Sequence, residues 1–166
     1  GPEGARKRYV GLRAGAAADA LEFGGMEVVR RDWTELAKNV QRELYRRLFA
    51  GAPVDEYLRD VVNDLQSGAL DGQLVYRKGL RKPLASYTAN TPPHVAAARK
   101  SAHRSGRVVA YLMTRAGPEP LDALTAAPDR AHYLERQIRP VAEPVLLTLG
   151  LSFDAVIGNA TQLRLF

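Results

Sequence analysis

The sequence predicts a mostly α-helical domain with a few short strands, which is an α+β fold. Three long segments carry apolar residues at helical spacing, whereas the β-branched and aromatic runs between them are short. The chain has 166 residues, of which 46% are hydrophobic, so it can bury a core as one domain or as two small lobes.

The first elements are predicted to be strands. RKRYVGL, residues 6–12, is typical of a short strand, and LEFGGMEVVRR alternates like a strand pair. The first helix is predicted to open at Asp32, because Glu35 follows three residues later as in a capping box, and to end at Gly51. Its apolar stripe is Trp33, Leu36, Ala37, Val40, Leu44, Leu48 and Phe49.

A second helix is predicted to start near Pro53 and to end at Gly68, packed antiparallel to the first. Its apolar positions are Val54, Tyr57, Leu58, Val61, Val62 and Leu65.

The middle of the chain is predicted to consist of shorter elements. We expect LVYRKGL to be extended, PLASYT and PPHVAAARKSAH to be short helices begun by proline, RVVAYLMT to be a strand and AGPEPL to be a turn.

The last long helix is predicted from Asp129 to Leu149. Its inward positions are Tyr133, Leu134, Ile138, Val141, Val145 and Leu146. Pro140 and Pro144 are expected to kink or split it, because a proline within a helix removes a hydrogen bond and clashes with the preceding turn.

The composition limits the class of protein. There is no cysteine, which excludes disulfides and thiolate metal sites and suits a reducing cytoplasm. No apolar run reaches the roughly 18 residues of a membrane span, and GPEGARKRY lacks the apolar core of a signal peptide. We therefore expect a cytoplasmic protein, associated with the nucleoid if it binds DNA, and no membrane partner.

Positive charge is concentrated in one stretch. From Gly72 to Pro118 there is no Asp or Glu, although the chain has 18 of them and its formal net charge is +6. Nine of the 24 Lys and Arg residues lie there: Arg77, Lys78, Arg81, Lys82, Arg99, Lys100, Arg104, Arg107 and Arg115. This stretch favours a surface that binds a polyanion, with nucleic acid as the first candidate and a plain solvated face as the alternative.

Catalytic chemistry is not evident. The histidines His94, His103 and His132 have no metal-ligand spacing, and phosphate-binding glycine motifs are absent. The acid pair Asp55 and Glu56 suits the first turn of a helix rather than a reaction. We predict that this chain alone is inactive and holds no catalytic residue, metal or cofactor.

Seven segments follow one another in a specific order: RKRYVGL, GGMEVVRRDWTELA, QRELYRRLF, LVYRKGLRKPLASYTANTPPHVAAA, GPEPLD, HYLERQIRPVAEPVL and the terminal QLRLF. In this succession they resemble the C-terminal end of bacterial family B DNA polymerases of the polymerase II type, which act in DNA replication and repair. The resemblance implies a helical thumb domain at 32–157, preceded by the palm end and palm–thumb junction at 1–31. A tail occupies 158–166. The palm, fingers and exonuclease, with the Mg²⁺-dependent nucleotidyltransferase chemistry, would lie outside this chain.

The same resemblance implies contacts with primer–template duplex DNA. The residues that match the family's duplex-binding segments are Arg6, Lys7, Arg8, Tyr9, Arg30, Arg31, Arg77, Lys78, Arg81, Lys82, His94, Lys100 and Arg104. A lysine on a strand edge can reach minor-groove acceptors that all base pairs share, so the expected binding is independent of DNA sequence. The helix begun by Pro92 and Pro93 is also expected to point free N–H groups at phosphate.

The terminal QLRLF resembles the pentapeptide by which bacterial replication proteins dock on the ring-shaped sliding clamp. Leu165 and Phe166 would fill an apolar pocket, Leu163 a neighbouring site, and Gln162 would hydrogen-bond at the rim. Arg164 occupies the tolerant position. The alternative for the tail is that it folds back onto the chain's own core. The alternative for the whole chain is a free-standing nucleic-acid-binding adaptor, or a separately encoded polymerase subunit, recruited to the clamp.

Overall fold

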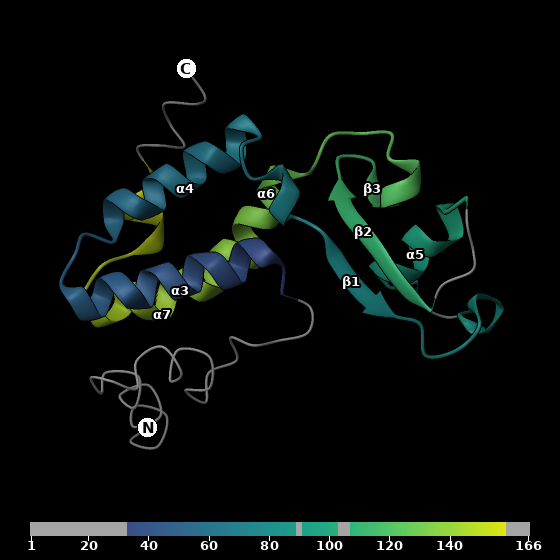
Figure 1. Ribbon diagram of the computed structural model, residues 1–166, viewed down its shortest axis with the longest axis horizontal. Coiled ribbons are helices and arrows are strands. Elements are labelled where there is room, and N and C mark those ends of the chain that lie inside the picture. The colour runs from purple at the N-terminus through teal and green to yellow at the C-terminus, as the bar shows by residue number, and fades with distance from the viewer. Residues whose placement is uncertain (1–32, 89–90, 103–106, 159–166) are drawn as a thin grey trace.

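The computed structural model describes residues 33–88, 91–102 and 107–158, which form a helical lobe and a sheet lobe (Figure 1). The helical lobe contains α3 (Glu35–Ala50), α4 (Asp55–Ser67), α6 (Arg130–Tyr133), a π-helical turn (Leu134–Ile138), α7 (Arg139–Thr148) and a final helical segment, 153–158. The sheet lobe contains β1 (Tyr76–Gly79), α5 (Pro93–Lys100), β2 (Val108–Thr114) and β3 (Gly117–Pro120). Short 3₁₀ turns lie at Asp71–Gln73, Leu84–Ser86 and Leu121–Ala123. The predicted mostly helical fold with short strands is confirmed.

The two predicted helix ends are confirmed, and one predicted start is wrong. Gly51 and Gly68 cap α3 and α4 in left-handed conformations with φ of 70° and 91°, which glycine adopts without steric cost. The cap of α3 is Thr34 rather than Asp32, because the Thr34 hydroxyl oxygen accepts a hydrogen bond from the Ala37 N–H at 3.2 Å. Asp32 itself lies outside the described residues.

Helix α3 packs chiefly along α7, which lies beside it in the helical lobe (Figure 1). The sequence predicted α4 as its packing partner. The two helices do run in opposite directions, but α4 lies on the other side of the helical lobe and α3 makes its larger contact with α7. Leu36, Val40 and Leu44 of α3 are at most 2% exposed. One continuous cluster of buried apolar side chains runs from this helical interior into the sheet lobe.

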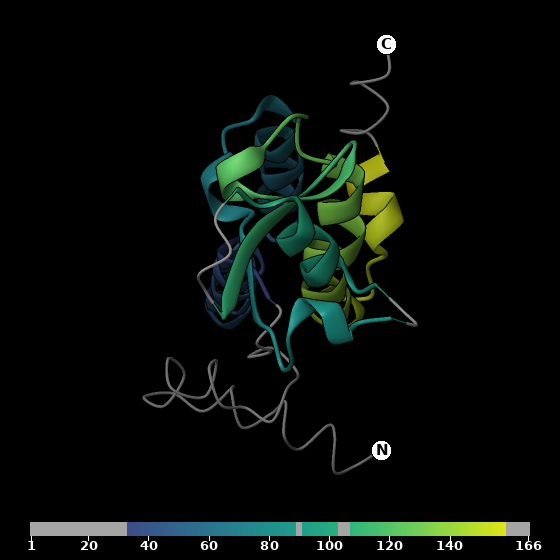
Figure 2. The ribbon, with the colours of Figure 1, turned by 90° about the vertical axis from the view of Figure 1, so that its right-hand side faces the viewer.

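The sheet is antiparallel, with strand order β1-β2-β3 and with α5 packed against β2 and β3 (Figure 2). Tyr111 of β2 lies opposite Tyr76 of β1 and Pro120 of β3. The prediction of a turn throughout AGPEPL is wrong, since only its first residue, Ala116, lies in the turn and Gly117–Pro120 is a strand. Proline is tolerated there because β3 is an edge strand, which leaves one side of its backbone unpaired in the sheet.

The prediction that proline would split the last helix is confirmed at Pro140. The helix is interrupted by the π-helical turn Leu134–Ile138, which ends two residues before Pro140. Proline has no N–H to donate to the preceding turn, so a widened turn at this point is consistent with its chemistry. Within the turn Gln137 points inward and is only 5% exposed. Pro144 lies inside α7, which continues through it to Thr148.

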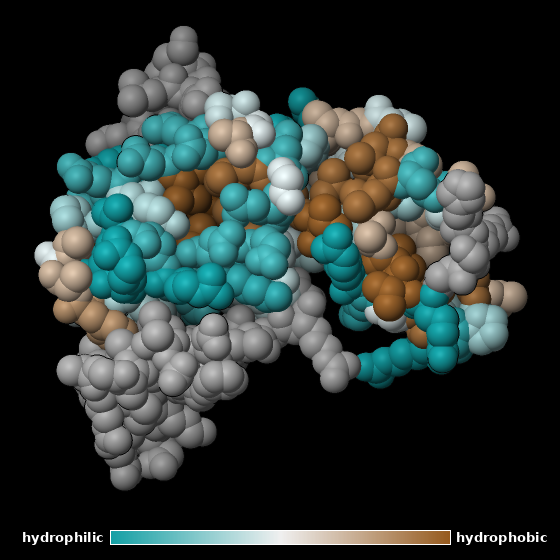
Figure 3. Space-filling model, viewed as in Figure 1, coloured by the Kyte–Doolittle hydropathy of each residue, from teal (hydrophilic) through white to brown (hydrophobic). Residues whose placement is uncertain are grey.

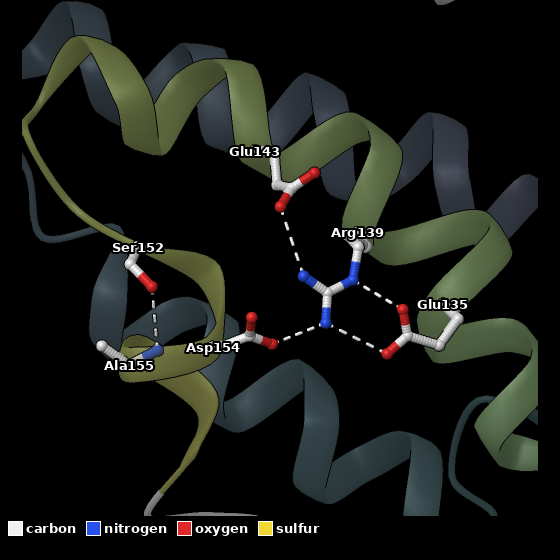
Figure 4. Close-up of polar contacts among 6 residues, drawn as sticks. All are labelled: Glu135, Arg139, Glu143, Ser152, Asp154 and Ala155. Carbon is white, nitrogen blue, oxygen red and sulfur yellow. Dashed lines mark hydrogen bonds and ion pairs between the residues drawn. The ribbon is translucent and has the colours of Figure 1, made fainter.

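Arg139, at the start of α7, joins that helix to the segment 153–158 (Figure 4). Its guanidinium donates to Glu135 at 2.6 and 3.1 Å, to Glu143 at 3.2 Å and to Asp154 at 2.6 Å. It also lies 4.6 Å from the ring centroid of Phe153, a buried residue of the same segment. These contacts fix the last described helical turn against the helical lobe.

The lobes meet at a cluster of aromatic side chains. The Tyr76 ring stacks on Tyr111 and on Tyr133, with centroids 5.3 and 5.5 Å apart. The Tyr76 hydroxyl lies 2.7 Å from Nε2 of His132, and the Tyr133 hydroxyl accepts a hydrogen bond from the Met113 N–H at 2.9 Å. The orientation of the sheet lobe is therefore set by both stacking and hydrogen bonds.

Candidate nucleic-acid interface

Four predicted DNA-binding cations form an exposed row along one edge of the sheet lobe. Arg77 and Lys78 lie on β1, and Arg81 and Lys82 lie in the loop that follows it. Hydrophilic residues line this lower edge of the sheet lobe in Figure 3. Among the described residues, no carboxylate forms an ion pair with any of the four. Their charges are thus available to a ligand.

The antiparallel pairing adds a fifth cation to this row. The Leu80 N–H donates to the Arg107 carbonyl at 2.6 Å, so the exposed Arg107, just before β2, lies beside the end of β1. The sequence shows Arg107 as one of the charges of the basic stretch and does not show that it lies beside β1. The signal that could have placed it is the pairing of LVYRKGL with RVVAYLMT, which sets Gly79 opposite Val108.

Tyr87 holds the cationic loop in place. Its hydroxyl accepts a hydrogen bond from the Arg81 backbone N–H at 3.1 Å, and the Lys82 ammonium lies 4.7 Å from its ring centroid. Arg99 of α5 then fixes the Tyr87 backbone, because its guanidinium donates to the carbonyls of Tyr87 at 2.6 Å and Leu84 at 3.3 Å. Arg99 therefore supports the loop rather than extending the cationic row.

Two other predicted phosphate ligands are engaged within the fold. The Lys100 ammonium donates to the Pro118 carbonyl at 2.8 Å, although the residue remains exposed. His94 is 5% exposed, and burial together with the nearby charges of Lys78 and Arg81 lowers the pKa of its imidazole. In this structure His94 therefore lies beneath the cationic surface, not on it.

The start of α5 offers fewer free donors than the sequence suggested. The N–H groups of Val95 and Ala96 both bond to the Pro92 carbonyl at 3.0 Å, and Pro93 has no N–H. The proline pair that starts the helix therefore leaves fewer donors for phosphate than the sequence suggested, because it accepts hydrogen bonds from two of the N–H groups and lacks a third.

The acidic residues that follow the basic stretch leave the row uncompensated. Glu119 of β3 is 4% exposed, and its carboxylate accepts hydrogen bonds from the N–H groups of Thr125 and Ala126 at 2.8 and 3.2 Å. In the helical lobe, by contrast, Glu43 pairs with both Arg46 and Arg47 at 2.6 Å. Glu119 is thus held by the backbone of its own lobe and Glu43 by arginines of its own helix, so neither carboxylate forms an ion pair with the row.

Several predicted site residues lie outside the described residues. They are Arg6, Lys7, Arg8, Tyr9, Arg30, Arg31 and Arg104 of the DNA set, and Gln162, Leu163, Leu165 and Phe166 of the clamp set. Within the described ranges, no three His, Cys, Asp or Glu side chains come together as a metal site would require. None of the helices in those ranges is both long and apolar enough to cross a bilayer.

Comparison with known proteins identifies the family. The family model described as DNA polymerase family B matches residues 4–142, which is most of the chain. The chain belongs to DNA polymerase family B. This family B chain is 45% identical to DNA polymerase II of Escherichia coli (strain K12) over 98% of its own length, and it covers 22% of that relative. The sequence-based resemblance to this family is confirmed.

More distant relatives agree. DNA polymerase 2 of Aeropyrum pernix is 32% identical over 95% of this chain, which covers 21% of that relative. The solved structure of the family B DNA polymerase from Pyrobaculum calidifontis matches with a TM-score of 0.59 and 28% identity, over 69% of this chain and 18% of that one. The chain thus spans about a fifth of the length of each of these polymerases.

Proposed function

We propose that this family B polymerase chain acts as the thumb, gripping the duplex made of template and new strand. The observation that carries the proposal is the row formed by Arg77, Lys78, Arg81, Lys82 and Arg107, exposed and without carboxylate partners among the described residues. Residues 1–31 would belong to the palm end and the palm–thumb junction, and 32–157 to the thumb.

The row suits phosphate binding without sequence readout. Adjacent cations on a strand and its following loop can neutralise successive phosphates of a duplex backbone, and each neutralised phosphate releases condensed counterions. A polymerase must hold whatever sequence it has just made, so a grip on backbone rather than bases fits the task. Binding should therefore fall steeply as salt rises.

Fluorescence anisotropy with a primer–template duplex tests this. The variant Arg77→Gln/Lys78→Gln should bind more weakly, and the slope of log K against log salt should become shallower by about 0.9 for each phosphate that is no longer neutralised. The matched control is Lys38→Gln/Arg42→Gln, which removes two exposed cations of α3 and should leave the slope unchanged. Equal losses of affinity in both variants would mean that only net charge matters, and would refute a specific interface.

We further propose that the tail docks on the sliding clamp through Gln162, Leu163, Leu165 and Phe166. The support is chemical: three large apolar side chains and one amide within five residues form a short anchor that a groove can bury. Deleting Gln162–Phe166 should abolish binding to the purified clamp and leave duplex affinity intact, whereas Arg164→Ala should preserve both. If the deleted chain still binds the clamp, the proposal that the tail docks there is wrong.

The whole polymerase reaction is proposed for the longer assembly. We propose that Mg²⁺, the catalytic carboxylates and the nucleotide site belong to palm and fingers outside this chain, and that this chain alone is inactive. The 45% identity over 98% of the chain supports a polymerase part over an unrelated adaptor. The native size, measured by immunoblot in source cells, distinguishes two possibilities. A band several-fold larger would mean that these residues are a domain of a longer polymerase chain, and a band of this size would mean a separate subunit.

A further inference from the structure

His94 is a buried side chain with one ring nitrogen that has no hydrogen-bond partner. It is the second residue of α5, it is 5% exposed, and its Nδ1 atom is buried with no hydrogen-bond partner. Buried polar atoms are nearly always hydrogen-bonded, so an unpaired imidazole nitrogen calls for an explanation. Imidazole is also the side chain whose charge changes most readily near neutral pH.

Among the described residues, the two charges that act on the pKa of His94 are both cationic. Lys78 approaches from β1 and Arg81 from the following loop, and both disfavour a positive charge on the ring. The Tyr87 ring meets the His94 ring edge to face, with centroids 6.2 Å apart and an interplanar angle of 85°. Since residues 72–118 contain no Asp or Glu, this stretch of the chain supplies no anion that could offset the repulsion.

The same two cations belong to the proposed duplex-binding row. A phosphate that binds Lys78 and Arg81 would offset the part of the lowered pKa of His94 that these two cations cause, while the larger contribution from burial would remain. The pKa of His94 should then rise, so that a larger fraction of the imidazole is protonated in the complex at a given pH. The reaction is simple proton uptake, in which one proton from solvent adds to a ring nitrogen and no other bond changes.

We propose that His94 is a proton-binding site coupled to the cationic row, so that binding of the duplex draws a proton onto this imidazole. The inference rests on the proposed thumb function and adds to it a dependence of DNA affinity on pH. By linkage, a group that is more basic in the complex than in the free protein strengthens binding as pH falls. For one proton the gain is at most about tenfold per pH unit.

The first test uses the wild-type chain alone. The His94 Hε1 resonance is followed by NMR from pH 4.5 to 8.5, with and without duplex. Free His94 should titrate below its ordinary value of 6.5, and saturating duplex should raise that midpoint. A midpoint that duplex leaves unchanged overturns the proposal. Because this measurement needs no substitution, it stands even where a variant fails to fold.

The second test is duplex affinity at constant ionic strength from pH 5 to 8. Wild type should bind more tightly as pH falls, His94→Gln should lose that dependence, and His103→Gln, a second histidine of the acid-free stretch, should keep it. Identical pH profiles for wild type and His94→Gln overturn the proposal while leaving the thumb function intact. Absence of duplex binding at every pH overturns both.

Discussion

The Oε1 atom of Gln137 accepts two hydrogen bonds from Thr34, one from its backbone N–H and one from its hydroxyl, each 2.9 Å long. Thr34 caps α3, and Gln137 lies in the π-helical turn before α7. Both residues are buried, at 1% and 5% exposed. One side chain thus ties the start of the first described helix to the irregular turn that proline imposes 103 residues later.

Replacing Gln137 with Leu should lower the free energy of unfolding by about 1–3 kcal/mol, because the Thr34 N–H would stay buried without an acceptor. Urea denaturation measures the change. Thr34→Ser keeps both donors and should lose much less. A Gln137→Leu variant as stable as wild type would show that the pair contributes nothing.

Arg139 is expected to stabilise the packing of the segment 153–158. Arg139→Ala would leave Glu135, Glu143 and Asp154 without their shared cation and should lower stability by about 1–2 kcal/mol. Arg46→Ala, which removes one exposed ion pair, should lower stability less than Arg139→Ala does. Thermal unfolding compares the two. Equal melting temperatures for both variants would contradict a special role for Arg139.

Acid should weaken the helical lobe partly through Glu43. Hydrogen bonds from Arg46 and then Arg47 hold the pKa of its carboxyl at about 2, below the ordinary 4.5. Since the folded state has the lower pKa, this contribution is full above about pH 4.5 and disappears as pH falls to 2. After solvent screening it amounts to less than about 1 kcal/mol. Urea denaturation of Glu43→Gln should show a shallower loss of stability over this pH range.

The joint between the lobes should be sensitive to one hydroxyl. Tyr133→Phe removes the acceptor of the Met113 N–H and should destabilise by about 1–2 kcal/mol, with faster hydrogen exchange at that amide. Burial raises the pKa of Tyr133, so the phenol stays protonated and the bond persists at neutral pH. Tyr57→Phe, at a tyrosine that is only partly buried, is the control and should change little. Unaltered exchange at Met113 would oppose the prediction.

Arg99 should affect duplex binding through the position of the loop. Arg99→Lys cannot bridge the Leu84 and Tyr87 carbonyls as the planar guanidinium does, so the loop holding Arg81 should exchange amide hydrogens faster. Duplex affinity should fall about two- to fivefold, because ordering that loop on binding then has an entropy cost. The salt slope should stay unchanged, since no phosphate ligand is removed. A reduced slope would make Arg99 a direct ligand instead.

Local signals predicted much of this fold correctly. Gly51 and Gly68 end their helices because only glycine enters the left-handed cap conformation freely. Most positions of the two predicted apolar stripes are buried, and the others are partly buried against the core. Strand β2 followed from its β-branched and aromatic residues, and β1 lies within the segment that was expected to be extended. Each of these features depends on neighbours a few positions away, which the sequence displays directly.

Features that depend on distant partners were missed. Thr34 replaces Asp32 as the cap, in a position where it also meets Gln137 across the fold. Strand β3 forms despite its prolines because β2 offers it an edge. The burial of His94 follows from the packing of α5 on the sheet and the cover of Tyr87, neither of which its own sequence context reveals.

The sheet lobe is one uninterrupted excursion of the chain. It leaves the helical lobe after Leu74 and returns at Asp129, and Tyr76 and Tyr133, close to the two crossing points, stack on each other. When the two ends of an inserted segment lie side by side, the segment can be lengthened, shortened or exchanged without changing the path of the chain through the other lobe. The cationic surface is thus carried on one contiguous segment of the chain. The charges of this surface can therefore change, in evolution or by design, while the residues of the helical core stay the same.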